Sequence, residues 1–227
     1  MGMTSKKPPP DQPPPPIFLH DETLQKEYPF IAGIDEAGRG PLAGPVVAAA
    51  VIFPSGVMIR GLRDSKQTAE KDRKRLFWEI VNKADAVGVG IVEADIIDRI
   101  NILQSTKLAM KMAVHDLGNR PDLLLIDAVS LTDVDIRQKS FIKGESVSAA
   151  IAAASIIAKV VRDDMMLDYH ERYPEYNFKK HKGYGTREHI KCINEYGPCP
   201  IHRKSFCRVK DAHLAFPSGQ DYDTPAS

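Results

Sequence analysis

Cysteine, tryptophan and long apolar runs are scarce in this chain of 227 residues, which has three cysteines and one tryptophan. Cys192, Cys199 and Cys207 are odd in number and include no Cys-x-x-Cys pair. This argues against a disulfide framework; a zinc site with His202 is conceivable but lacks the short paired ligands of structural zinc. The longest apolar run, residues 45–54, is about half the length of a membrane-spanning helix, and the N-terminus lacks the apolar core of a secretory signal. We therefore expect free thiols in a reducing cytoplasm and no membrane association.

The chain also has no large excess of positive or negative charge, because its formal net charge is only +1. The distribution of charge is more informative than its sum. Residues 179–210 contain nine Lys or Arg side chains against two Glu, with histidine and aromatic residues interleaved. This composition is typical of a surface that faces phosphates, although a solvated basic segment would have the same composition.

Proline is concentrated at the N-terminus, where the sequence KKPPPDQPPPP cannot form a packed core. We predict a disordered tail over residues 1–26, one folded domain over residues 27–215 and a flexible tail over residues 216–227. The central segment is long enough for a single domain with a full core.

Short β-branched and apolar runs predict five strands. They are Phe30–Ile34, Val46–Phe53, Ala86–Val92, Leu123–Ile126 and Ser140–Ile142. The first three strands have no long crossover between them and predict an antiparallel meander. The later strands follow helical segments and predict parallel additions. The expected fold class is therefore α/β, with a mixed sheet flanked by helices.

Helical spacing predicts three longer helices and a C-terminal third of short helices and loops. The longer ones are Thr68–Lys83 with Thr68 as its N-cap, an amphipathic Leu103–Leu117 with Leu103, Leu108, Met112 and Leu117 on its apolar face, and an Ala-rich helix from Ser146 to about Tyr169.

Acidic residues follow two of the predicted strands. Asp35 and Glu36 come directly after the first strand, and Asp127 follows the fourth. Carboxylates that converge at a sheet edge repel one another unless cations neutralise them, and their oxygens suit Mg²⁺ or Mn²⁺. Any one of these residues could instead cap a turn. Together they predict a divalent metal site.

A fourth acid is available on the long Ala-rich helix. Asp163 and Asp164 are about 100° apart around a helix, so only one can face a given site. The apolar pattern of the helix does not choose between them.

The segment Gly38-Arg39-Gly40 lies beside the first acids. Glycines let backbone groups approach a sugar or phosphate closely, and an arginine can bind a phosphate. Lys66 and Lys143 are predicted loop lysines that could contact phosphates as well.

Several motifs in order resemble one family. They are IDEAGRGPL at residues 34–42, DSK at 64–66, INIL at 100–103, LID at 125–127, AASIIAKVVRD at 153–163, HKGYGT at 181–186 and HRKSF at 202–206. Together they resemble bacterial ribonuclease HII, a type 2 ribonuclease H. The similarity runs from about Phe30 to Lys210. The proline-rich tail and the segment Ser146–Ala150 depart from the family pattern.

The resemblance implies a ribonuclease H-like fold with a helical C-terminal extension. It implies that Asp35, Glu36, Asp127 and Asp163 are the catalytic metal ligands. It further implies that the loop Gly38-Arg39-Gly40 and Tyr184 read the ribonucleotide of the substrate.

The expected activity is hydrolysis of the RNA strand of RNA–DNA hybrids and cutting on the 5′ side of ribonucleotides embedded in duplex DNA. Two Mg²⁺ or Mn²⁺ ions would activate water and stabilise the leaving group, giving a 3′-hydroxyl and a 5′-phosphate. The enzyme is expected to be a monomer. The alternatives are a different metal-dependent nuclease on the same fold, a non-catalytic hybrid-binding module and a small-molecule phosphohydrolase.

Overall fold

The computed structural model describes residues 15–62 and 68–215. Its strands are β1 (Ile31–Ala37), β2 (Val46–Ile52), β3 (Ala86–Val92), β4 (Leu123–Asp127) and β5 (Arg137–Phe141). Its α-helices are α1 (Pro16–Gln25), α2 (Glu70–Lys83), α3 (Ala94–Asp116), α4 (Ala149–Arg172), α5 (Phe178–His181), α6 (Arg187–Tyr196) and α7 (Cys207–Ala215), with 3₁₀ turns η2 (Gly144–Ser146) and η3 (Pro174–Tyr176).

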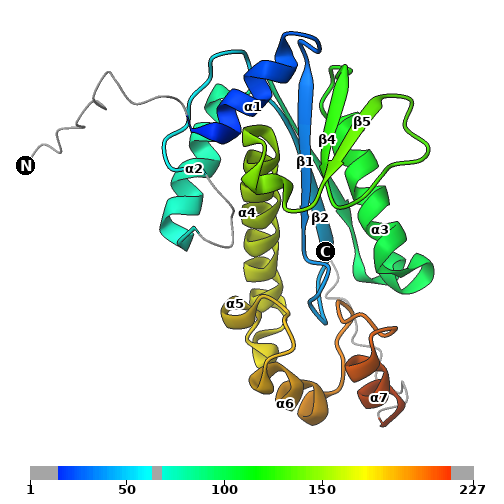
Figure 1. Ribbon diagram of the computed structural model, residues 1–227. Helices are drawn as coiled ribbons and strands as arrows, with labels where there is room; N and C mark the ends of the chain where they lie inside the picture. Colours follow the sequence, from blue (N-terminus) through cyan, green and yellow to red (C-terminus); the bar gives the residue numbers. More distant parts are fainter. Residues whose placement is uncertain (1–14, 63–67, 216–227) are drawn as a thin grey trace, which may run out of the picture.

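The strands form one mixed sheet in the order β3-β2-β1-β4-β5. The pairs β1–β2 and β2–β3 are antiparallel, and β1–β4 and β4–β5 are parallel. The predicted meander followed by parallel additions is therefore confirmed. Helices cover both faces of this sheet, as Figure 1 shows, so the expected mixed sheet flanked by helices is confirmed.

Strand β2 shows how the sequence places the two layers. Its residues are all buried, and successive side chains point to opposite faces. Val47, Ala49 and Val51 belong to the core shared with α2 and α4, whereas Ala48 and Ala50 belong to the core shared with α3. A continuous apolar run is what a strand covered on both faces requires.

Helix α4 lies very close to β1. A Cβ atom added at Gly33 would lie 2.1 Å from the backbone carbon of Ala150, so only glycine fits there. The small side chains at the start of α4 allow the same close approach, because alanine at residues 149, 150, 152, 153 and 154 is buried. This contact fixes α4 against the strand that carries Asp35 and Glu36.

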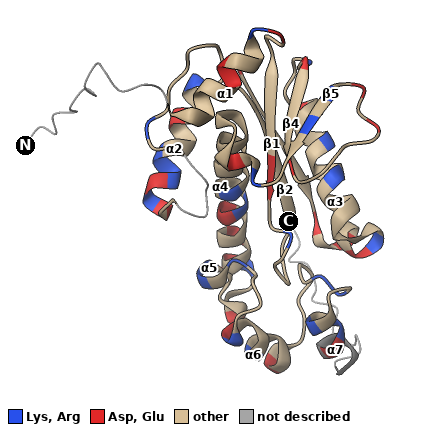
Figure 2. Cartoon of the chain, viewed as in Figure 1, with Lys and Arg blue, Asp and Glu red and all other residues tan. Residues whose placement is uncertain are grey.

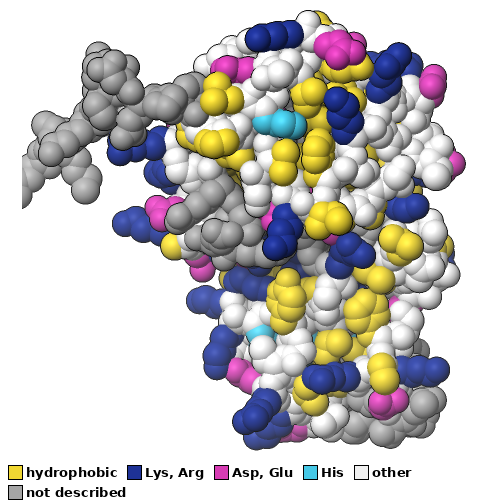
Figure 3. Space-filling model, viewed as in Figure 1, with side chains coloured by type: hydrophobic (Ala, Val, Ile, Leu, Met, Phe, Trp, Pro, Cys, Tyr) yellow, Lys and Arg dark blue, Asp and Glu magenta, His cyan; other side chains and the backbone are white. Residues whose placement is uncertain are grey.

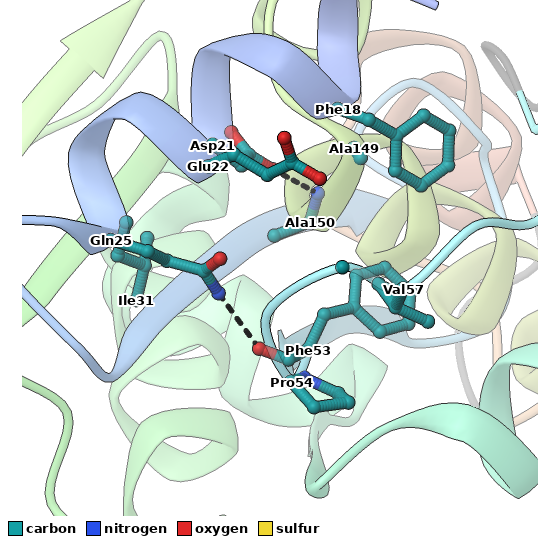
Figure 4. A pocket seen from close by; sticks show the side chains of 11 residues that line it. Phe18, Asp21, Glu22, Gln25, Ile31, Phe53, Pro54, Val57, Ala149 and Ala150 are labelled. Carbon is teal, nitrogen blue, oxygen red and sulfur yellow. Dashed lines mark hydrogen bonds between the residues drawn. The ribbon is translucent and has the colours of Figure 1, made fainter. Parts of the chain in front are cut away.

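Helix α1 corrects the predicted boundary of the N-terminal tail. Residues 16–26, predicted to be disordered, contain α1, whose Phe18 side chain is only 3% exposed. Asp21 Oδ2 accepts hydrogen bonds from Ser148 Oγ and the Ala150 amide, each 2.9 Å long, and so caps α4. Figure 4 shows the bond between Asp21 and Ala150. The proline-rich composition hid a helix because Pro16 occupies the first helical position, where its missing N–H is not needed.

Two smaller predictions were also wrong. Helix α2 is capped by Ala69 without a side-chain bond, and Thr68 is not its N-cap. In α3 the predicted apolar face is largely exposed, with Leu103 at 42% and Met112 at 43%, whereas Ala109 and Met110 are buried. The helix also contains a break at Asn101, which has φ 66°.

The helical C-terminal part lies beyond one end of the sheet, where α4 continues into the region of α5 and α6 (Figure 1). Its own core includes Tyr176, Phe178 and Ile193. Within the described ranges, no helix combines the length and apolar character needed to span a membrane.

Candidate active site

Three predicted carboxylates lie at the ends of β1 and β4, which are adjacent and parallel, with Ile34 paired to Ile126. Asp35 is only 7% exposed. Burial raises the pKa of its carboxyl well above the usual value, and the charges of Glu36 and Asp127 raise it further, against a hydrogen bond from Ser155. The sheet therefore brings these three carboxylates close together at one edge.

The turn after β5 adds an acid that the sequence analysis did not select. The Gly144 amide donates to Asp127 Oδ1 over 2.9 Å. The next residue, Glu145, is 9% exposed. Among the described residues its Oε2 atom is buried and has no hydrogen-bond partner. The signal that could have revealed it is the position of an acid just after a second parallel strand, in the motif Lys143-Gly144-Glu145.

These donors fit a hard divalent cation. All are carboxylates, Asp35 is buried beside two further negative charges, and Glu145 has a buried oxygen without a partner in the described chain. Mg²⁺ and Mn²⁺ prefer such oxygen ligands. Within the described ranges, however, no three acidic, histidine or cysteine side chains already form a metal-binding group.

Asp163, predicted as the fourth ligand, lies in a different electrostatic setting. Its Oδ1 atom is 2.6 Å from Lys159 Nζ, and its Oδ2 atom is 3.9 Å from Arg73 Nη2. Asp163 is buried on α4, whereas its neighbour Asp164 is exposed and pairs with Lys74 at 3.6 Å. The structure therefore separates the two helix acids, and it gives Asp163 two cationic partners, Lys159 and Arg73.

The loop after β1 lies against Tyr184. A Cβ atom added at Gly40 would be 3.8 Å from Tyr184 Cε1, and the Leu42 amide donates to the Gly183 carbonyl over 2.8 Å. The Tyr184 ring is 45% exposed. The exposed side chain of Arg39 reaches back to Glu36, with 3.4 Å between Nη1 and Oε1. The structure thus joins Gly38-Arg39-Gly40, Tyr184 and the carboxylates of β1 in one continuous region.

The two predicted phosphate-binding lysines differ in outcome. Lys143 is exposed in a left-handed conformation, φ 59°, at the start of the turn that carries Gly144. This places it beside Asp127, at the edge of the acidic group. Lys66 lies outside the described residues.

The basic C-terminal stretch is only partly a surface. Lys and Arg residues are spread along the backbone of this half of the molecule (Figure 2), and their side chains are scattered over the face that Figure 3 shows. Arg203 is an exception, because its side chain is 0% exposed. Composition alone could not distinguish this buried arginine from the surface residues around it.

The family model of Ribonuclease HII matches residues 32–209. This chain belongs to the ribonuclease HII family. A Ribonuclease HII of Acetivibrio thermocellus is 57% identical over 187 residues, covering 82% of this chain and 73% of that protein.

Solved structures support the same assignment at the level of the fold. The ribonuclease H2 of Pyrococcus horikoshii OT3 has a TM-score of 0.69 at 25% identity, over 84% of this chain and all of that chain. Bst-RNase HIII in complex with Mn²⁺ has a TM-score of 0.65 at 21% identity, over 82% of this chain and 70% of that chain. As a member of this family, the protein is a metal-dependent ribonuclease H, an endonuclease that acts on RNA–DNA hybrids.

Proposed function

We propose that this protein also cuts duplex DNA on the 5′ side of a single embedded ribonucleotide, leaving a 3′-hydroxyl and a 5′-phosphate. Its cellular task would be to remove ribonucleotides from DNA and RNA primers from replicated strands. The observation that carries this proposal is the position of Gly40 next to the exposed Tyr184 ring, where an added Cβ atom would lie 3.8 Å from Cε1, in the loop that follows the acids of β1.

A 2′-hydroxyl distinguishes RNA from DNA at one position, and it can both donate and accept hydrogen bonds. The backbone of Gly38-Arg39-Gly40 can approach it because two of the three residues have no side chain. Tyr184 can pack on the neighbouring sugar, which fits best when that sugar lacks a 2′-hydroxyl. A junction between one ribonucleotide and the following DNA would therefore be recognised on both of its sides.

We propose that Asp35, Glu36 and Asp127 hold the divalent ions. Two such ions, Mg²⁺ or Mn²⁺, supply an activated water and neutralise the leaving oxygen when bound. Ser155 orients Asp35 by a hydrogen bond, and the Gly144 amide fixes Asp127. The Mn²⁺ complex of Bst-RNase HIII, which has the same fold, supports this choice of ions.

The fourth ligand has two candidates. The family resemblance assigned Asp163, whereas the contacts favour Glu145, which adjoins Asp127 and keeps a buried oxygen without a partner in the described chain. Asp163 is already neutralised by Lys159 and Arg73. We propose Glu145 as the fourth ligand and keep Asp163 as its tested alternative.

The protein is proposed to act as a monomer in the cytoplasm, in keeping with its three free thiols.

Three matched duplexes test the cleavage proposal: all DNA, DNA with one ribonucleotide, and a continuous RNA–DNA hybrid. Each is incubated with Mg²⁺ or Mn²⁺, and the product ends are mapped.

We expect a single cut on the 5′ side of the lone ribonucleotide, cleavage of the hybrid and none of the all-DNA duplex. Cleavage of the all-DNA duplex would favour a different nuclease activity on this fold. Binding without metal-dependent cleavage of any duplex would favour a binding module.

A further inference from the structure

Arg203 is a fully buried arginine whose hydrogen bonds converge on one short loop. Four of its bonds go to backbone carbonyls between residues 38 and 44. They run from Nη2 to Gly38 O at 2.6 Å, from Nη1 to Arg39 O at 3.0 Å and Pro41 O at 2.9 Å, and from Nε to Gly44 O at 3.0 Å. The loop that follows β1 is thus wrapped around a single guanidinium group.

Burial of the Arg203 guanidinium costs free energy that its hydrogen bonds must offset. A buried charge is costly unless it is paired or fully hydrogen-bonded. The loop carbonyls supply the hydrogen-bond partners of the Arg203 side chain, and the negative charge of Asp98 favours its protonated form. Burial and the charge of Arg162 lower the pKa of Arg203 to about 9. The group therefore remains protonated at neutral pH, and its N–H donors stay available.

Because peptide bonds are planar, the hydrogen bonds from Arg203 to the loop carbonyls also fix the direction of the neighbouring backbone amides. In a trans peptide the carbonyl and the N–H of the same unit point in opposite directions. Because Arg203 holds the carbonyls of Gly38 and Arg39, the amides of Arg39 and Gly40 point away from the buried guanidinium. Both of these residues are exposed. Two neighbouring backbone donors are therefore presented outward beside the acids of β1.

Arg162 secures the same loop from α4. Its Nε atom donates to Pro45 O at 3.0 Å and its Nη2 atom to Ala43 O at 3.1 Å. Its Nη1 atom donates to Lys182 O at 3.0 Å, and its Cζ atom lies 6.0 Å from the centre of the Tyr184 ring. The loop after β1 and the loop of Tyr184 are therefore tied to one side chain.

Gly38 shows how tightly this arrangement is packed. Its φ is +98°, and a Cβ atom there would lie 2.1 Å from Arg162 Nε. A side chain would displace the arginine and strain the backbone together. The loop is thus held in one conformation before any substrate arrives.

We propose that Arg203 is a positioning residue for ribose recognition, which holds the carbonyls of the Gly38-Arg39-Gly40 loop so that its amides face the 2′-hydroxyl of the substrate. This inference rests on the proposed function. A flexible loop would lose conformational entropy on binding, and Arg203 removes that cost in advance. Non-specific affinity for DNA, which comes from basic surface side chains, is independent of it.

Arg203→Lys tests the proposal because lysine keeps the charge but cannot span carbonyls on four residues. Binding is measured without divalent metal, on a duplex with one ribonucleotide and on the matched all-DNA duplex. We expect the preference for the ribonucleotide duplex to fall at least five-fold, with affinity for DNA nearly unchanged. Cleavage of the ribonucleotide duplex with Mg²⁺ should fall at least ten-fold.

Ile193→Ala is the matched control. Ile193 is buried in the same C-terminal core but makes no hydrogen bond to the loop through its side chain. It should lower the melting temperature and leave the ribose preference unchanged. Equal loss of affinity for both duplexes in Arg203→Lys, or an unchanged preference, would overturn the inference.

A second variant covers the case in which Arg203→Lys does not fold. Asp98 accepts hydrogen bonds from the amides of Lys204 and Ser205, both 2.9 Å long, and so holds the segment that carries Arg203. Asp98→Ala should lower the ribose preference in the same direction by a smaller factor, and an unchanged preference would again contradict the inference. Wild-type protein that cuts no ribonucleotide substrate would instead refute the proposed function itself.

Discussion

Glu145 and Asp163 illustrate how two buried acids of the same chain can have different roles. Asp163 is within 4 Å of two cations, at 2.6 Å from Lys159 and 3.9 Å from Arg73. Glu145 Oε2 is buried without a hydrogen-bond partner in the described chain. A buried carboxylate oxygen that lacks a partner costs free energy, and a bound cation would remove that cost. This difference predicts that Glu145, rather than Asp163, binds the metal.

Substituting each acid by its amide separates the two assignments. We expect Glu145→Gln to lower kcat about a hundred-fold, roughly 2.7 kcal/mol in the barrier, and to weaken Mn²⁺ binding in a calorimetric titration. Asp163→Asn should keep Mn²⁺ affinity near that of the wild type. Normal metal affinity in Glu145→Gln together with a loss in Asp163→Asn would restore the assignment made from the family resemblance.

Tyr184 has an exposed ring, and contacts with Arg162 and within its own loop hold this residue in place. It lies over Arg162, and its carbonyl accepts from the Thr186 amide at 2.8 Å. We expect Tyr184→Ala to lower cleavage at a single ribonucleotide at least ten-fold and a continuous hybrid much less, because only the junction has a neighbouring deoxyribose. Tyr184→Phe is the control for the phenol group. Equal slowing on both substrates would contradict the proposed role of the ring.

At the scale of elements, most of the sheet could be predicted from the sequence because buried strands require apolar runs, and acids mark the ends of two of them. Strands β2 and β3 match the predicted ranges closely. Helix α3 was misjudged for a physical reason: Ser105 and Thr106 are fully buried, since their hydroxyls donate to the Asn101 and Ile102 carbonyls. Polar residues that satisfy their own hydrogen bonds do not mark an exposed face.

Helix α1 could not be predicted because its contribution is made through contacts far along the chain. Asp21 accepts from Ser148 and from the Ala150 amide, so a residue near the N-terminus caps the helix that carries Asp163. A carboxylate at this end of a helix is also favoured by the helix dipole. The proline-rich context and the low amphipathicity of residues 16–25 gave no sign of this role.

A deletion before α1 and substitutions within it test the contribution of this helix. Removal of residues 1–14 should leave the cleavage rate and melting temperature nearly unchanged. Asp21→Ala should destabilise the fold by about 1–3 kcal/mol, because two buried donors lose their acceptor. Asp21→Asn, which keeps one acceptor oxygen, should cost less. Urea unfolding followed by circular dichroism measures both, and an unaffected Asp21→Ala protein would contradict the capping role.

At the scale of the whole molecule, both polar and apolar contacts join the helical C-terminal part to the rest of the fold. Tyr169 donates to Glu93 at 3.1 Å, and Asp98 accepts from the segment after Arg203. Phe206 packs against both the α3 core and the C-terminal core. The sequence motifs indicated the acids and the Tyr184 loop separately. Only the fold shows that the acids belong to the sheet and that the Tyr184 loop belongs to the helical C-terminal part.

A chain of neutral histidines runs through the C-terminal part to the Tyr184 loop. The Cys199 amide donates to His202 Nδ1, so the proton of His202 lies on Nε2. His202 Nε2 then donates to His189 Nε2 over 3.0 Å, and His189 Nδ1 donates to the Tyr184 carbonyl. Burial lowers the pKa of His189 to about 4, and burial with the nearby His189 lowers that of His202 to about 3. A further proton would place two N–H groups against each other.

This pair of buried histidines predicts that the protein loses stability as the pH falls below the pKa of an unfolded histidine. Unfolded histidine has a pKa of about 6.5. The stability held by His189 and His202 is complete above that value and is lost as pH falls toward their folded values of about 4 and about 3. At pH 5 each histidine should cost about 2 kcal/mol relative to pH 7.5. Urea unfolding at several pH values measures this slope. His189→Gln should flatten it, whereas His115→Gln, at an exposed position, should not. An unchanged slope in His189→Gln would show that the buried histidines do not set the acid limit of the fold.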